Sequence, residues 1–132
     1  MIAIDTNVLV RFLVRDDEAQ AESARRRLKL AEERRERLFV PLLVVLETIW
    51  VLESAYDKTR PEILECIRDM RQMPVFEFQE DRAIEAFLND GLVYKADLSD
   101  ILIAYSAENA GCDGGITFDK AAARLPFFSL LK

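Results

Sequence analysis

Short apolar runs alternate with longer amphipathic segments along the chain, and this alternation predicts strands followed by helices. The first apolar run ends in polar residues, which predicts a buried strand over residues 2–5 and a helix from Asn7 to about Leu13. A long charged helix follows from near Asp17, with Asp16 or Asp17 as its cap. The remaining predicted elements are a strand at 39–41, helices at 42–56 and 60–73, a strand at 75–78, a helix at 80–94 that ends near Gly91 or slightly later, a helix at 98–111 stopped by Gly111, a strand at 114–118, a short helix at 119–125 and a strand at 127–131.

The order of these elements indicates an α/β domain. Parallel strands need crossover connections, and helical crossovers cover both faces of the sheet. We therefore expect a three-layer α/β/α arrangement around a parallel sheet of about five strands. The chain has four glycines, four prolines and no internal repeat or low-complexity stretch, so we expect residues 1–132 to form a single domain.

The amino-acid composition excludes several classes of protein and of catalytic site. No apolar stretch approaches the ~20 residues of a membrane span, and the N-terminus lacks a secretory leader pattern, so we expect a soluble cytoplasmic protein with no membrane partner. Cys66 and Cys112 lie far apart, which favours small apolar filler over a zinc site or a disulfide framework. Histidine is absent, which excludes Ser-His and Cys-His nucleophile pairs and His-ligated zinc. A catalytic or metal site in this chain must therefore use other side chains, and among these the carboxylates of Asp and Glu favour hard cations such as Mg²⁺ and Mn²⁺.

Several carboxylates occupy unexpected positions. Glu47 interrupts the apolar run 42–52, which predicts a largely buried helix, and an unpaired buried carboxylate costs several kcal/mol. The alternatives for Glu47 are an ion pair with an Arg such as Arg11, an exposed helix edge, or a metal site. Asp97 and Asp100 share one face at the start of the helix at 98–111. Asp97 fits a helix cap, and the choice between capping and function stays open for Asp100.

Asp119 follows an apolar strand, as Asp5 does, and it also fits a helix cap. Because parallel strands end at one edge of a sheet, Asp5, Asp100 and Asp119 can meet there, with Glu47 leaning into the same cleft. Carboxylates within a few Å of one another repel by about 1–4 kcal/mol per pair, and a divalent cation offsets that repulsion. If these four carboxylates do meet at one edge of the sheet, a shared metal site explains them better than four separate helix caps do.

The ordered motifs resemble those of PIN-domain ribonucleases, specifically the VapC-like toxins of prokaryotic toxin-antitoxin pairs. Asp5 in IDTNVLVR is similar to the first family motif, Glu47 in VVLETIWVL to the second, Asp100 in DILIA to the third and Asp119 in ITFDKAA to the fourth. The resemblance extends from residue 1 to about residue 131, and it implies a parallel sheet of about five strands with helices on both faces.

The resemblance implies a Mg²⁺- or Mn²⁺-dependent endoribonuclease, in which the four motif carboxylates hold the metal. Water with a lowered pKa would attack the phosphorus in line and leave a 5′-phosphate and a 3′-hydroxyl. Asn7 and Thr117 would orient the carboxylates or the water, and Asp97 would be a further ligand or only a cap. The family also implies a homodimer and a small antitoxin protein that covers the acidic cleft.

The charge pattern adds candidates for RNA contact. The net charge of −6 argues mildly against broad binding to polyanions. The basic run 25–37 favours a solvated helix with pairs such as Glu33 with Arg37 over a phosphate-binding face. Arg11 and Arg15 are better candidates for RNA contact, because they directly follow the Asp5 motif.

Two other classes compete with a nuclease. The first is a non-catalytic acidic-pocket module that binds metal structurally or signals as a receiver domain does. Lys120 only superficially fits the late lysine of a receiver, and Glu47 falls on a predicted helix rather than at a strand tip. The second is a haloacid-dehalogenase-type phosphatase, which needs a second carboxylate at the position of Asn7.

Overall fold

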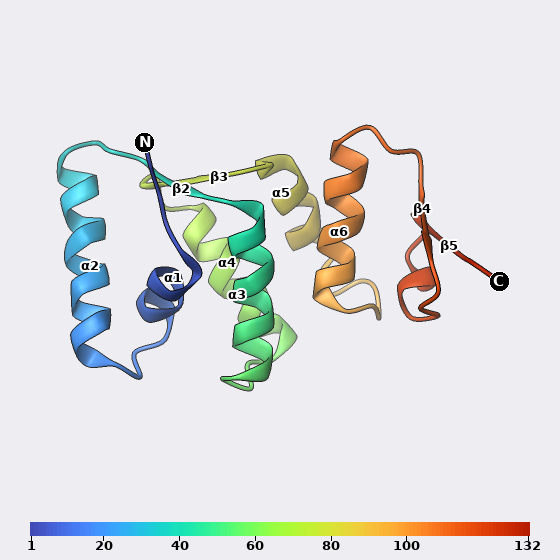
Figure 1. The fold of residues 1–132 in the computed structure, drawn as a ribbon, viewed down its shortest axis with the longest axis horizontal. Helices are drawn as coiled ribbons and strands as arrows, with labels where there is room; N and C mark the ends of the chain where they lie inside the picture. The colour runs from blue at the N-terminus through green and yellow to red at the C-terminus, as the bar shows by residue number, and fades with distance from the viewer.

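The computed structural model describes residues 1–132, and helices alternate with short strands along the chain (Figure 1). The elements in order are β1 (Ile2–Ala3), α1 (Thr6–Leu13), α2 (Glu18–Glu33), β2 (Leu38–Val40), α3 (Leu42–Ser54), α4 (Arg60–Arg71), β3 (Phe76–Phe78), α5 (Asp81–Asp90), α6 (Leu98–Asn109), β4 (Gly115–Thr117), the 3₁₀ helix η1 (Ala122–Arg124) and β5 (Phe128–Leu130). Every predicted element is present, with ends that differ by a few residues, but two differ in kind. The first strand is exposed at Ile2 and Ala3 instead of buried, and the helix predicted at 119–125 is the short 3₁₀ helix η1.

All strand pairs are parallel, as the sequence predicted. β2 lies at the centre of a three-stranded sheet in the order β1-β2-β3, where Ile2 pairs with Leu38 and Leu38 with Phe76. β4 and β5 form a second sheet, in which Gly115 pairs with Phe128. The α/β class and the five parallel strands are confirmed.

The strands are divided between two sheets, whereas the sequence led us to expect one. Figure 1 shows α6 between the three-stranded sheet and the β4–β5 pair, which forms the end of the molecule opposite α2. The C-terminal segment is held there by Ala122 and Leu125, which are buried, and Leu125 belongs to the same apolar cluster as Ala104 of α6. β4 therefore lies on the far side of α6 from β1, and β1 has β2 as its only partner strand.

Local polar contacts explain where several helices begin and end. The Asp17 carboxylate accepts a hydrogen bond from the Gln20 N–H at 3.0 Å and caps α2. Thr59 and Glu62 form a reciprocal capping box at the start of α4. After α6, Gly111 adopts a φ of +98° that favours glycine, so the helix stops where the sequence predicted.

The core contains apolar side chains from the three-stranded sheet and from all six helices, among them Ile49, Phe87 and Ile101, which are fully buried. The expectation that α3 would be largely buried is only half right. Val45, Ile49 and Leu52 face the core, whereas Trp50 is 66% exposed on the opposite side. The exposed face of α3 therefore carries the apolar residues Leu43 and Trp50 together with Glu47 and Glu53.

Expectations drawn from composition are partly corrected. Cys112 is exposed, so it does not fill the core, whereas Cys66 is half-buried. α2 ends at Glu33 and the chain turns before Arg37, which pairs with Glu77 at 3.0 Å instead of with Glu33. None of the helices has the length and apolarity that a membrane crossing requires.

Candidate acidic site

Asp5 lies where β1 leads into α1. Its backbone is extended, with φ −87° and ψ 158°, and its Oδ1 accepts a hydrogen bond from the Thr6 N–H at 2.6 Å. Oδ2 accepts no hydrogen bond, and the carboxylate is exposed. Asp5 therefore caps the helix with one oxygen and leaves the other open to a ligand.

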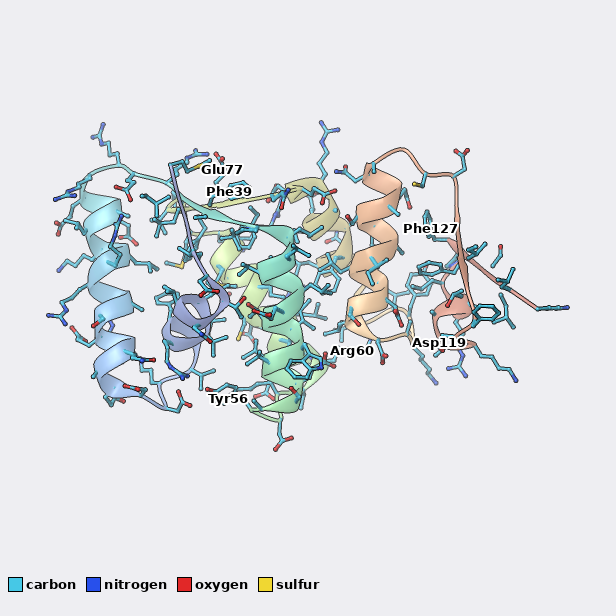
Figure 2. The ribbon with its side chains drawn as sticks, viewed as in Figure 1. Phe39, Tyr56, Arg60, Glu77, Asp119 and Phe127 are labelled. Carbon is cyan, nitrogen blue, oxygen red and sulfur yellow. The ribbon has the colours of Figure 1, made fainter.

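Asp119 repeats this arrangement after β4. Its Oδ1 accepts a hydrogen bond from the Ala121 N–H at 2.8 Å, and its own N–H donates to the Thr117 hydroxyl oxygen at 3.0 Å. Thr117 therefore holds the backbone of Asp119 in place. Figure 2 shows Asp119 at the β4–β5 end of the molecule.

Asp97 and Asp100 lie at the start of α6. Asp97 occupies the cap position, with φ −60° and ψ 144°, but its carboxylate makes no capping hydrogen bond. Asp100 is half-buried in the first turn, and burial together with the charges of Asp97 and Asp119 raises its pKa. The Asp97 carboxylate therefore forms no cap bond from its cap position, and the charges of Asp97 and Asp119 both act on Asp100.

Glu47 lies on the exposed side of α3, the helix that packs against both α1 and α6. An ion pair with Arg11 was one explanation for this residue, and the structure contradicts it. Arg11 instead pairs with Asp16 at 3.0 Å, and Glu47 has no ion-pair partner. Glu47 therefore presents an exposed carboxylate without an ion-pair partner on a helix that packs against both α1 and α6.

The structure brings part of the predicted set together. Asp97 and Asp119 lie within electrostatic reach of Asp100, whereas Asp5 and Glu47 are not among the charges that act on it. No three acidic side chains lie close enough together to hold one ion. None of the five carboxylates is in an ion pair, so no cationic side chain neutralises them.

A cavity of about 340 Å³ between α1 and α2 lies next to the Asp5 motif. Asn7, Arg11 and Arg27 line it, and these side chains offer N–H donors that suit phosphate oxygens. Arg11 also donates to Gln20 at 2.6 Å and to the Tyr56 hydroxyl at 3.0 Å, so it is fixed in place. Arg15, the other residue predicted to contact RNA, is exposed.

Sequence reasoning missed two residues beside this site. Arg60 donates hydrogen bonds to the carbonyls of Gly91 at 3.0 Å, Tyr94 at 3.1 Å and Ala96, and so holds the segment that leads into Asp97 (Figure 2). Its role could not be predicted, because its partners are backbone atoms about thirty residues away.

Glu53 is the second residue, on the same helix as Glu47. Burial and the Asp97 charge raise its pKa, and the Arg60 guanidinium opposes this rise. A second carboxylate in the same apolar helix was a signal that the sequence offered.

Comparison with known families gives one match. A family model described as the PIN domain matches residues 2–128, which is nearly the whole chain. A search of curated proteins found no match.

Proposed function

This chain belongs to the PIN-domain family, and from that membership we propose that it is a Mg²⁺- or Mn²⁺-dependent endoribonuclease. The PIN domain is a nuclease fold, so the family assigns hydrolysis of phosphodiesters in general. We further propose that the substrate is RNA and that this chain cuts within the RNA strand.

One observation carries it: the family match extends from residue 2 to residue 128 and includes all the acidic residues predicted to act. Asp5 and Asp119 each end a parallel strand, and Asp97 and Asp100 begin the helix beside them. Asp5 follows a strand of the three-stranded sheet and Asp119 follows a strand of the β4–β5 sheet, and in α/β proteins ligands bind at the carboxyl ends of parallel strands. Asp5 and Asp119 each use one carboxylate oxygen in a local backbone hydrogen bond, which leaves the other oxygen available to a ligand.

The side chains present fit a hard divalent cation in type and charge. All donors are carboxylate oxygens, the ligands that Mg²⁺ and Mn²⁺ prefer. The raised pKa of Asp100 reflects burial and like-charge repulsion, and no Lys or Arg relieves that repulsion through an ion pair. We propose that Asp5, Glu47, Asp100 and Asp119 hold the cation, with Asp97 as a further ligand.

The bound cation supplies Lewis-acid activation of water and neutralises charge on the phosphodiester. Thr117 fixes the backbone of Asp119 and so limits how far that carboxylate can turn. Asn7 faces the cavity beside Asp5, where its amide can orient the attacking water or the phosphate. Arg11 and Arg15 bind the RNA backbone on the same side, and the products carry 5′-phosphates and 3′-hydroxyls.

The test is cleavage of an RNA panel that contains single strands, loops and duplexes. We expect cuts with 5′-phosphates in Mg²⁺ or Mn²⁺, and we expect none in EDTA or with Asp5→Asn. Asp113→Asn is the matched control, because it removes an exposed carboxylate between α6 and β4. Cleavage that survives both EDTA and Asp5→Asn would contradict the proposal.

The biological role proposed is that of a cytoplasmic VapC-like toxin that forms a homodimer and is inhibited by a small antitoxin protein. Leu43 and Trp50 are exposed on α3, on the side that also carries Glu47 and Glu53, and exposed large apolar side chains of this kind support a protein partner. Induced expression in bacteria is expected to arrest growth, and Asp5→Asn is expected not to. Equal growth with both chains would contradict the toxin role.

A further inference from the structure

The cavity of about 340 Å³ between α1 and α2 is lined by cationic and neutral side chains. α1 contributes Asn7 and Arg11, and α2 contributes Gln20, Ser23 and Arg27. The two helices pack against each other at the end of the molecule opposite the β4–β5 pair (Figure 1). No carboxylate lines this cavity, although the whole chain has a net charge of −6. It is therefore a local positive site, which suits an anion.

The sequence places these side chains on one stripe of each helix. Asn7 and Arg11 are four positions apart, and Gln20, Ser23 and Arg27 follow one another at intervals of three and four. Side chains at these spacings share one face of a helix. The polar groups of both helices therefore converge on the same cavity.

Arg27 differs from the rest of the basic run 25–37. Arg25 fits a solvated helix, because it is 42% exposed and pairs with Glu22 at 2.9 Å. Arg27 lines the cavity instead and donates from Nη2 to Glu36. Its Nη1 is buried and has no hydrogen-bond acceptor. A buried donor without an acceptor is unfavourable, and an oxygen of an anion in the cavity would supply one.

Arg11 is held in a similar way on the other side of the cavity. Its Nε donates to Gln20 at 2.6 Å, and its Nη1 donates to Asp16 and to the Tyr56 hydroxyl, both at 3.0 Å. Nη2 takes part in none of these bonds. Each of the two guanidinium groups is therefore fixed at one end and keeps an Nη group for a ligand, so binding does not have to order either side chain.

A phosphate group fits this set of donors. The planar guanidinium matches the oxygens of a phosphate, and a phosphate has enough acceptor oxygens to contact Arg11, Arg27 and the Ser23 hydroxyl together. The volume lies within the range of about 300–1,000 Å³ that is usual for ligand sites. Asn7 and Ser23 are exposed, so a phosphate that belongs to a longer strand can reach the cavity.

The larger cavity at the other end of α2 does not have this character. It has a volume of about 460 Å³ and is lined by Arg35 and Arg37, but also by Glu32 and Glu36. The two carboxylates balance the two guanidinium groups. An anion is therefore favoured only in the cavity between α1 and α2.

This cavity is separate from the acidic site. Arg11 follows Asp5 by six residues, which corresponds to about 9 Å along a helix axis. One phosphate group cannot contact both positions. A strand with one phosphate at the acidic site would therefore place a different phosphate between α1 and α2.

We propose that the cavity between α1 and α2 binds a phosphate group through Arg11 and Arg27, and that in the RNA substrate this phosphate lies outside the bond that is cut. The phosphate site stands on the cavity itself, whereas its use for RNA rests on the nuclease function proposed above. Arg27 then fixes the path of the strand as it leaves the acidic site.

Binding of a fluorescent single-stranded RNA, followed by anisotropy in EDTA, tests the site without cleavage. Ser23→Asp adds a carboxylate to the cavity at an exposed position, and Ser23→Asn is the neutral control of the same size. We expect Kd to rise about tenfold with Ser23→Asp, because the new charge repels the phosphate. Ser23→Asn should change Kd by less than about twofold.

The salt dependence of Kd tests Arg27 directly. Each phosphate contact contributes about 0.7 to the slope of log K against log salt for a single strand. Arg27→Gln should lower this slope by about 0.7. Arg25→Gln removes the same charge from the same helix and should leave the slope unchanged. Equal slopes for the two variants would overturn the proposal.

Two RNAs distinguish the possible sources of the phosphate. One has a 5′-phosphate and the other has a 5′-hydroxyl. If Ser23→Asp weakens binding of both RNAs, the cavity holds an internal phosphodiester. If it weakens only the first, the cavity holds the terminal phosphate. Each result supports a phosphate site, whereas wild-type affinity for both RNAs would overturn it.

Inorganic phosphate separates failure of this proposal from failure of the nuclease function. Its addition to isotope-labelled protein should shift the amide resonances of Gln20 and Ser23 in the wild type and not in Ser23→Asp. Such shifts without cleavage of any RNA would retain the phosphate site and remove the nuclease function. Cleavage by the wild type, with RNA affinity unchanged in Ser23→Asp, would overturn the phosphate site and retain the nuclease.

Discussion

Replacement of Arg60 by Ala should loosen the segment that leads into α6. The guanidinium donates to three backbone carbonyls, those of Gly91, Tyr94 and Ala96, and thereby ties the start of α4 to that segment. A hydrogen bond from a charged donor is worth about 1.5–3 kcal/mol. The segment is partly exposed, so water replaces some of the lost bonds and the total falls well below three times that value.

We expect Arg60→Ala to lower the free energy of unfolding by about 3 kcal/mol, which corresponds to a fall in Tm of about 10 °C for a domain of this size. Circular dichroism melts measure the shift. Arg68→Ala is the matched control on the same helix, because Arg68 donates a single bond to the Leu88 carbonyl at 3.4 Å. We expect that control to cost under about 1 kcal/mol. Equal shifts for the two variants would refute the reasoning.

Three further predictions concern stability. Thr59→Ala removes the capping box of α4 and should cost about 1 kcal/mol in urea unfolding, whereas no change would show that the cap is dispensable. The hydrogen bond from the Tyr56 hydroxyl, and then the charge of Arg11, lower the pKa of Asp16. Ionised Asp16 therefore stabilises the fold near neutral pH, and this stabilisation is lost as the pH falls through the lowered pKa. The Tm of Asp16→Asn should therefore depend less on pH than that of the wild type in acid, and equal dependence would contradict the assignment. Gly115→Ala would place a Cβ 2.7 Å from the Phe128 ring and should lower the free energy of unfolding by about 1–3 kcal/mol. Gly114→Ala should lower it by less, and the reverse order would contradict this packing.

The sequence predicted the elements well because local signals specify them. Asp17 and Thr59 cap helices, Gly111 ends one, and the change between short apolar runs and amphipathic segments separates strands from helices. The sequence did not predict the division of the strands into two sheets. That division depends on where Leu125 packs, in the same apolar cluster as Ala104 of α6, and such a long-range contact has no local signature.

The sequence singled out the candidate carboxylates, and it did not predict how they are arranged in space. Asp5 and Asp119 stand out because each follows an apolar strand, and each carboxylate accepts a local backbone hydrogen bond, Asp5 from Thr6 and Asp119 from Ala121. The distance between them could not be predicted, because it depends on the separation of β1 from β4. The role of Arg60 could not be predicted because its partners are backbone carbonyl groups, and these leave no signal in the sequence.

Binding of Mn²⁺, followed by electron paramagnetic resonance, tests the central claim most directly, because a free and a bound ion give different signals. The account predicts saturable binding to the wild-type chain and to Asp113→Asn, with binding weakened at least tenfold in Asp5→Asn and in Asp100→Asn. Equal binding to all four proteins would show that these carboxylates do not hold the ion, and it would contradict the account.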